Sequence, residues 1–237
     1  MQTVIVIPTY NERDNIERLV EGILALRPDV QVLIIDDGSP DGTGEIAEAL
    51  KERYSHVHAI HRPCKQGLGT AYIAGFKWAL ASGIDYVVTM DADFSHHPCY
   101  IPQFLAEAQT HDLVIGSRYI AGGGTLDCSP GRQLLSRTAN AFARGALGLK
   151  VNDCTGGFRC YRRRALESIG LDQIFSDGYS FLIEILYRCQ REGCRITEVP
   201  IIFEDRRRGA SKISRKEILK AMYTVLRLWW ERVLSQC

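Results

Sequence analysis

Two aspartates one residue apart carry the clearest chemical signal in the sequence. Asp91 and Asp93 lie directly after the apolar run 85–90, which predicts a buried strand. Two carboxylates on a chain leaving a strand can converge on one hard cation, and Mg²⁺ or Mn²⁺ takes such oxygen ligands together with substrate phosphates. The alternative is a solvated acidic strand end. The strand position favours the metal site, and we expect His96 and His97 to serve packing or polar loop roles.

Polar and aromatic side chains follow two further predicted strands. Asp37 comes directly after the apolar run 31–36, where its carboxylate can accept hydrogen bonds from a ribose or a nucleobase. Tyr10 and Glu12 follow the run 3–8, where Tyr10 can stack on a base and Glu12 can accept a proton from a base or ribose. The alternative role of this segment is helix capping by Asn11 with Glu12 in the first turn, and both roles are compatible.

Basic residues gather in segments that the pattern predicts as loops. Arg118 follows the strand at 113–115, and Arg132 ends a Gly-rich loop over 119–131. Arg206 and Lys212 bound a basic run that also holds glycine and serine, a composition suited to phosphate oxygens. A solvated charged face is the alternative. We favour phosphate binding, because Arg118 falls on the sheet edge that carries the aspartates.

The elements that must position these side chains alternate between strand and helix in the first half. Strands are expected at 3–8, 31–36, 56–62, 85–90 and 113–115, and helices at 11–26, from an N-cap at Thr43, and at 67–81. This order predicts an α/β fold with a mostly parallel sheet covered by helices on both faces. Ligands bind beyond the carboxyl ends of such strands, which is where Asp37, Asp91 and Arg118 lie.

The second half is less regular and ends in an amphipathic helix. Helices are expected at 132–149, 181–191 and 216–234, and strands at 153–162 and 196–203. In the last helix, an apolar stripe spans about 80° at roughly 100° per residue; it consists of Ile218, Met222, Val225, Trp229 and Val233. The helix either lies on a membrane surface or docks on the core, and these two roles stay open. No repeat or linker divides the chain.

Composition excludes several classes of protein. The 237 residues hold 29 Lys and Arg against 28 Asp and Glu, so net charge gives no attraction to nucleic acid. The eight cysteines form no CxxC pair and no zinc spacing, which indicates reduced thiols. Dinucleotide, P-loop and serine-hydrolase motifs are absent. With no signal-peptide pattern and no apolar run of about 18–20 residues, we expect the protein in the cytoplasm or on the cytoplasmic side of a membrane.

Five segments, taken together and in order, resemble one family. They are residues 6–12 (VIPTYNE), 36–43 (DDGSPDGT), 91–98 (DADFSHHP), 116–118 (GSR) and 205–212 (DRRRGASK). They resemble the polyprenol (dolichol) monophosphate mannose synthases among the inverting family-two glycosyltransferases of GT-A fold. The N-terminal motifs are shared by many family-two enzymes, whereas the Asp-Ala-Asp-x-x-His-x-Pro form and the basic loop are more specific to the lipid-phosphate branch.

The resemblance implies a GT-A-like, mostly parallel Rossmann-type sheet within one glycosyltransferase domain over 1–237. Its parts are a nucleotide-sugar half at about 1–118, an acceptor-side half at about 119–212 and an amphipathic helix at about 214–234. The implied reaction is metal-dependent, inverting transfer of mannose from GDP-mannose to a polyprenyl or dolichyl monophosphate. Alternatives are another family-two enzyme, such as a UDP-glucose:polyprenol-phosphate glucosyltransferase, and a non-catalytic subunit that binds a nucleotide sugar.

The resemblance also implies roles for individual residues. Asp91 and Asp93 would hold Mg²⁺ or Mn²⁺, with Ser95 at the place of a third ligand, where some relatives carry Gln. Asp93 and Arg118 would be catalytic. The nucleoside pocket would be lined by Pro8, Tyr10, Glu12, Ile35 and Asp37, the backbone of Ala92 would contact the donor, and phosphates would be bound by Arg118, Arg132, Arg206 and Lys212.

The family's location is implied as well. The enzyme would work at the cytoplasmic face of a membrane, which is the endoplasmic reticulum in a eukaryote and the plasma membrane in a prokaryote. Some relatives carry C-terminal membrane spans that this chain lacks. Contact with the bilayer would then be peripheral or made through small membrane-anchoring subunits.

Overall fold

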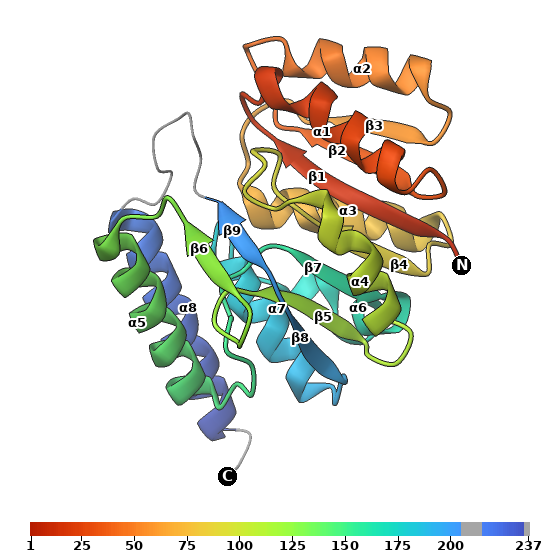
Figure 1. The fold of residues 1–237 in the computed structure, drawn as a ribbon. Helices are drawn as coiled ribbons and strands as arrows, with labels where there is room; N and C mark the ends of the chain where they lie inside the picture. Colours follow the sequence, from red (N-terminus) through yellow and green to blue (C-terminus); the bar gives the residue numbers. More distant parts are fainter. Residues whose placement is uncertain (205–214, 235–237) are drawn as a thin grey trace.

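A seven-stranded sheet forms the centre of the molecule (Figure 1). The computed structural model describes residues 1–204 and 215–234, so the predicted phosphate-binding residues Arg206 and Lys212 lie outside the described residues. The strands are β1 (Thr3–Thr9), β2 (Gln31–Asp36), β3 (Val57–His61), β4 (Tyr86–Thr89), β5 (Leu113–Ser117), β7 (Arg159–Arg162) and β8 (Ile196–Pro200). Their order is β3-β2-β1-β4-β7-β5-β8.

Strand direction confirms a mostly parallel sheet with one exception. β1 pairs in parallel with β2 and β4, β2 with β3, and β5 with β8. β7 lies antiparallel between β4 and β5. Because β7 runs the opposite way, the residues that precede it meet the carboxyl ends of the parallel strands.

Helices cover both faces of the sheet, as the sequence predicts. One face packs against α1 (Arg13–Leu26), α2 (Thr43–Arg53) and α4 (Ile101–Glu107), and the other against α3 (Leu68–Ala81), α6 (Arg163–Ser168) and α7 (Ser180–Arg191). Side chains alternate along β1: Val4 and Val6 join the α3 side, and Ile5 and Ile7 the α1 side. Burial on both faces explains why the strands read as continuous apolar runs.

Two long helices form an outer layer. α5 (Pro130–Leu147) and α8 (Arg215–Leu234) lie side by side, and α8 also packs on α7 (Figure 1). Val225 and Leu228 of α8 are buried, whereas Met222, Trp229 and Val233 of the predicted stripe are exposed. The expected stripe is therefore only partly the buried face of α8.

The second half differs from expectation in three places. The predicted loop at 119–131 contains β6 (Gly124–Leu126), which pairs in parallel with β9 (Ile202–Glu204) in a separate two-stranded sheet. The strand expected at 153–162 is formed only by its last four residues, because residues 153–158 make a loop held by side-chain hydrogen bonds. The strand expected at 196–203 breaks at Ile201 and continues in the second sheet.

Two capping expectations are wrong. Asn11 adopts a left-handed conformation with φ of 60° and does not cap α1, whose N-cap is Glu12. Thr43 is the first residue of α2 rather than its cap, and Gly42 with φ of 93° holds the cap position. The Thr43 hydroxyl donates to Asp41 and accepts from the Glu12 backbone N–H at 3.0 Å, so it ties the starts of the two helices together.

Candidate active site

A cavity of about 350 Å³ lies at the carboxyl edge of the parallel strands. One end is polar and is lined by Asp91, Asp93 and Ser95 after β4 and by Arg118 after β5. The rest extends between α5, α7 and α8. The apolar side chains of those helices that line it include Leu135, Ala139, Phe142, Ile183, Met222 and Val225. The cavity thus joins a charged end to a hydrocarbon-like wall.

Asp91 and Asp93 are placed by the turn that follows β4. The Ser95 backbone N–H donates to Oδ1 of Asp93 at 3.0 Å, which fixes that carboxylate within the turn. The Tyr72 hydroxyl donates to Oδ1 of Asp91 at 3.5 Å. Burial raises the pKa of Tyr72 well above its ordinary value, so this hydroxyl keeps its proton and remains a donor.

The donor set at this turn fits a hard divalent cation. Ser95 is only 2 % exposed, and among residues 1–204 and 215–234 its hydroxyl oxygen, Oγ, has no hydrogen-bond partner. A buried unpartnered oxygen is costly unless something binds it. With the carboxylates of Asp91 and Asp93 it offers the oxygen ligands that Mg²⁺ and Mn²⁺ prefer. Among the described residues no three His, Cys, Asp or Glu side chains gather as a metal cluster, so substrate phosphates and water would complete the shell.

His96 packs against this turn and His97 lies in a polar loop, which agrees with the packing or polar loop roles expected for the two histidines. Nδ1 of His96 accepts the Asp91 backbone N–H at 3.1 Å, and its ring stacks on Phe158 with centroids 5.1 Å apart. Burial lowers the pKa of His96, so the ring is neutral and carries its proton on Nε2. His97 accepts the Cys99 backbone N–H and caps a short turn.

Arg118 is held rigidly by a buried carboxylate. Its Nε and Nη2 donate to the two oxygens of Asp153 at 2.7 and 2.8 Å, and Nη2 also donates to Oγ1 of Thr155 at 2.8 Å. Burial alone would lower the pKa of Arg118, but the charge of Asp153 outweighs it and raises that pKa. The same pairing keeps the pKa of Asp153 below its ordinary value, although burial would raise it. Both groups are charged at neutral pH, and the planar guanidinium has a fixed direction.

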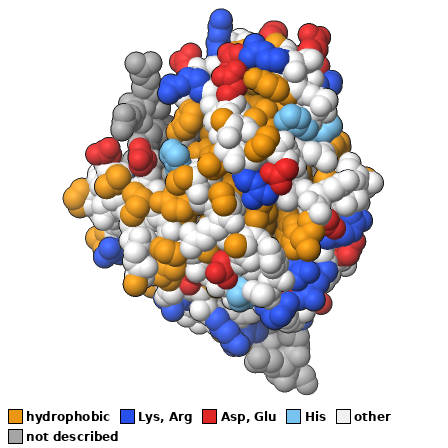
Figure 2. All heavy atoms as spheres, turned by 45° about the vertical axis from the view of Figure 1, so that its right-hand side comes forward, with side chains coloured by type: hydrophobic (Ala, Val, Ile, Leu, Met, Phe, Trp, Pro, Cys, Tyr) orange, Lys and Arg blue, Asp and Glu red, His pale blue; other side chains and the backbone are white. Residues whose placement is uncertain are grey.

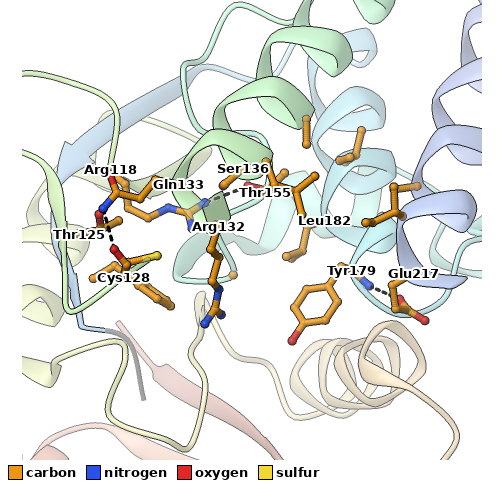
Figure 3. A pocket seen from close by; sticks show the side chains of 18 of the residues that line it. Arg118, Thr125, Cys128, Arg132, Gln133, Ser136, Thr155, Tyr179, Leu182 and Glu217 are labelled. Atoms are coloured by element: carbon orange, nitrogen blue, oxygen red, sulfur yellow. Dashed lines mark hydrogen bonds between the residues drawn. The ribbon is translucent and has the colours of Figure 1, made fainter. Parts of the chain in front are cut away.

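Arg132 belongs to the same cavity but comes from the first turn of α5. Figure 3 shows it extending into the space between Cys128 and Tyr179. The Tyr179 backbone N–H donates to Glu217 of α8 at 3.4 Å, which ties the start of α7 to the start of α8. The structure therefore brings Asp91, Asp93, Ser95, Arg118 and Arg132 to one cavity, as the sequence predicts.

The predicted nucleoside residues lie at the ends of β1 and β2, beside this cavity. Tyr10 is half-buried, with Nζ of Lys65 4.3 Å from its ring centroid. Asp37 forms a buried ion pair with Arg62 and also accepts the Gln66 backbone N–H at 3.2 Å. Both oxygens of the Asp37 carboxylate therefore already have a protein partner, and Arg62 balances its charge.

The other predicted contacts differ in burial. Pro8 is half-buried and Glu12 is buried, with its Oε2 accepting the Asn15 amide at 2.9 Å. The side chains of Ile35 and Ala92 are in the two cores that flank the sheet. For Ile35 and Ala92 only backbone contact with a donor agrees with this burial.

Several residues of the site are absent from the predictions made from the sequence. Asp153 and Thr155 were placed within a strand, although Gly156-Gly157 after an Asp-x-Thr pattern is typical of a loop held by side-chain hydrogen bonds. Arg62 is not predicted as a site residue, because nothing in the sequence next to it shows that it pairs with Asp37, 25 residues away.

The fold and site define an α/β protein with a charged cavity where its parallel strands end. Comparison with known proteins gives the family. The family model described as "Glycosyl transferase family 2" matches residues 4–170. The chain belongs to this family and is a glycosyltransferase, which confirms the resemblance seen in the motifs.

Two curated relatives are similar over nearly the whole chain. The polyprenol monophosphomannose synthase of Mycolicibacterium smegmatis is 44% identical over 226 residues, covering 94% of this chain and 85% of the relative. The undecaprenyl-phosphate mannosyltransferase of Micrococcus luteus is 42% identical over 227 residues, covering 96% of this chain and 93% of the relative.

A solved structure supports the GT-A-like fold. The glucosyl-3-phosphoglycerate synthase of Mycobacterium tuberculosis, in complex with Mn²⁺, UDP and phosphoglyceric acid, aligns with a TM-score of 0.71 at 22% identity. The alignment covers 96% of this chain and 78% of that one. At this identity the likeness supports the fold alone.

Proposed function

We propose that the protein transfers mannose from GDP-mannose to a polyprenyl or dolichyl monophosphate, with inversion at the anomeric carbon. The cavity carries this proposal: Asp91, Asp93, Ser95 and Arg118 form its polar end, and apolar side chains of α5, α7 and α8 form its wall. A lipid monophosphate matches these two regions, because its dianionic head fits the polar end and its hydrocarbon chain fits the apolar wall. The names of the two curated relatives point to the same acceptor class and the same sugar.

Donor binding and acceptor binding are assigned to different parts of the chain. We assign donor binding to about residues 1–118, acceptor binding to about 119–212 and membrane contact to the helix at about 214–234, all within one catalytic domain. Tyr10, Glu12 and Asp37 lie at the ends of β1 and β2, on the donor side. Arg132 lies on α5 beside the apolar wall, on the acceptor side.

The chemistry requires no general base. A phosphate monoester has a second pKa of about 6, so the acceptor is already a nucleophile at neutral pH. The difficulty is charge repulsion. The anionic acceptor phosphate must approach the anionic donor, and a nucleoside diphosphate must depart from the sugar with additional negative charge. Arg118 and Arg132 point cations at this cavity and offset that repulsion. A divalent ion on Asp91, Asp93 and Ser95 would supply charge stabilisation for the leaving diphosphate.

Arg118 is suited to its role because its orientation is set before substrate binds. The Asp153 and Thr155 contacts leave part of the guanidinium edge to face the cavity. A preorganised donor of this kind costs no reorganisation when charge develops. We therefore assign Arg118 the stabilisation of phosphate charge in the transition state, and Asp93 the metal-dependent part of the reaction.

We further propose that α5 and α8 contact a lipid bilayer. Large apolar side chains are exposed on both helices; they are Leu134, Leu135 and Phe142 of α5 and Leu219, Met222, Tyr223, Leu226, Trp229, Trp230, Val233 and Leu234 of α8. On the face of the molecule drawn in Figure 2, which is turned away from α5 and α8, hydrophobic side chains lie among polar and charged ones. Tryptophan and tyrosine favour the headgroup region of a membrane.

No helix among residues 1–204 and 215–234 has the length and apolar character needed to cross a bilayer. The cytoplasmic face of a membrane, with peripheral contact or small anchoring subunits, remains our proposal for the location.

A direct assay tests the function. The purified chain is offered GDP-mannose or UDP-glucose with a short polyprenyl phosphate, in Mg²⁺, Mn²⁺ or a chelator, and the lipid product is identified by mass. We expect a mannosyl product that requires the divalent ion. A glucosyl product would replace the donor assignment, and the absence of any glycosylated lipid would refute the proposal.

A pair of aspartate variants tests the metal site. Asp93→Ala should lower metal-dependent transfer by about 100-fold or more, because the cation loses a carboxylate ligand. Asp29→Ala, in the exposed turn between α1 and β2, is the matched control and should retain full activity. Near-full turnover by a folded Asp93→Ala protein would contradict the metal assignment.

A further inference from the structure

Helix α5 contains a buried asparagine that faces the site without lining it. Asn140 is 3 % exposed, although this position on the inner face of an amphipathic helix would normally be apolar. The residues lining the cavity include its neighbours Ala139 and Phe142 but not Asn140. Its side chain therefore acts on protein atoms only.

Both ends of the Asn140 amide are used. Its Oδ1 accepts the Cys154 backbone N–H at 2.6 Å, and its Nδ2 donates to Oγ1 of Thr155 at 3.1 Å and to the Ser136 carbonyl at 2.9 Å. A buried amide with every contact made costs little, whereas one unmade contact would cost much. Asn140 thus attaches the middle of α5 to two consecutive residues of the loop at 153–158.

The Thr155 hydroxyl continues this chain to Arg118. A hydroxyl has one proton to donate and two lone pairs. Oγ1 of Thr155 donates to Asp153 at 3.3 Å and accepts from both Asn140 and Nη2 of Arg118, so its capacity is filled. Its orientation is therefore set jointly by α5 and by the Arg118–Asp153 pair.

A second contact runs in parallel. The hydroxyl of Tyr119, the residue after Arg118, donates to Oγ of Ser136 at 2.7 Å, one turn before Asn140 on α5. Two independent hydrogen-bond paths thus join α5 to the chain at 118–119. The same helix contributes Leu135 and Phe142 to the apolar wall.

We propose that Asn140 is a positioning residue for Arg118: through Thr155 it couples the placement of α5, the helix that forms the lipid-facing wall, to the direction of the Arg118 guanidinium. This inference rests on the proposed function in assigning Arg118 to phosphate. The helix that forms the apolar wall thus helps to hold the Arg118 guanidinium in its direction before the acceptor lipid binds.

A double-mutant cycle tests the coupling. Asn140→Leu keeps the side-chain size and the helical preference but removes all three hydrogen bonds of the amide. Without Asn140, Thr155 no longer holds its hydrogen bond with the charged Arg118 in place. The loss of one hydrogen bond to a charged group corresponds to a fall in kcat of about 10- to 100-fold, and we expect a smaller change in the KM for the donor. In an Arg118→Lys background, where the planar fork is gone, Asn140→Leu should have no further effect. An unchanged kcat, or an equal fall in both backgrounds, would overturn the proposal.

A second pair of variants covers the case in which Asn140→Leu does not fold. Thr155→Val removes the bridging hydroxyl and Thr155→Ser restores it. We expect the valine variant to lose activity in the wild-type background only, and the serine variant to behave as wild type. Equal activity of the two variants would refute the bridge.

A readout independent of turnover separates this inference from the proposed function. The Nε–H signal of Arg118 in a ¹⁵N NMR spectrum, assigned by its loss in Arg118→Lys, should exchange with water about 10-fold faster in Asn140→Leu. If the wild-type protein transfers no sugar but the exchange changes as expected, the function is wrong and the coupling stands. If transfer is observed but the exchange is unchanged, the coupling is wrong.

Discussion

Membrane binding by the exposed face of α8 gives a prediction that one matched pair of leucines can decide. Leu226 of α8 is 51% exposed, and Leu26 at the end of α1, on the far side of the molecule, is 42% exposed (Figure 1). Full burial of a leucine side chain is worth about 1.5–3 kcal/mol, so the exposed half of Leu226 contributes about 1 kcal/mol on entering a bilayer. Leu226→Ser should therefore weaken vesicle binding about 5-fold, and Leu26→Ser should leave it unchanged.

Adding the two tryptophans enlarges the effect. Trp229 and Trp230 are 42% and 58% exposed, which together is about the area of one whole tryptophan, roughly 250 Å². Removing half of that area from water at headgroup depth is worth about 3 kcal/mol at ~25 cal/mol per Å². Serine at Leu226, Trp229 and Trp230 together should weaken binding by more than about 100-fold.

The assay is co-sedimentation of the full chain with phosphatidylcholine vesicles over a range of lipid concentrations. Circular dichroism of each variant shows that α8 remains folded. Equal loss of binding for Leu226→Ser and Leu26→Ser would mean that attachment is not localised to α8. Unchanged binding of the triple variant would show that this face does not contact lipid.

Three further predictions concern packing, thiol chemistry and metal. An alanine Cβ at Gly75 of α3 would lie 2.6 Å from Val6, whereas at Gly22 of α1 it meets nothing within 4 Å; Gly75→Ala should thus lower the free energy of unfolding by about 1–3 kcal/mol and Gly22→Ala should raise it by about 0.5–1 kcal/mol in urea titrations. The hydrogen bond from the buried Cys189 thiol lowers the pKa of Cys194 to about 7, so its thiolate forms as pH rises through 7, and its iodoacetamide alkylation, followed by mass spectrometry, should reach half its maximum there; a midpoint above 8.5 would contradict this. Mn²⁺ with a nucleoside diphosphate should raise the Tm by several degrees in a concentration-dependent way, and a chelator should reverse the shift; no shift would count against the metal site.

Much of the sheet is predictable because its strands are buried on both faces. The runs at 3–8 and 31–36 are apolar without interruption, and turn residues follow each of them directly. The direction of β7 is not predictable in the same way. Its register depends on pairing with β4 and β5, which are far away in the sequence, and nothing within Arg159–Arg162 encodes that choice.

Some residues of the site are predictable from their local sequence, whereas others depend on partners far away in the chain. The sequence predicts that Asp91, Asp93 and Arg118 meet, because the carboxyl ends of parallel strands share an edge. Asp153 was missed because its importance comes from Arg118, 35 residues away in the chain. The stripe on α8 leaves membrane contact and core docking open, because periodicity identifies an apolar face but not the neighbours, α5 and α7, that cover part of it.

The reversed direction of β7 has a consequence for how this architecture can diversify. β5 ends and β7 begins at the same edge of the sheet, so the excursion between them, including β6, α5 and the loop at 153–158, leaves and re-enters without crossing the sheet. Such an excursion can be lengthened, shortened or exchanged while the strands on either side keep their pairing. Acceptors of different size can therefore be accommodated by changes in β6 and α5, as long as Asp153 and Thr155 at the end of the segment still hold Arg118.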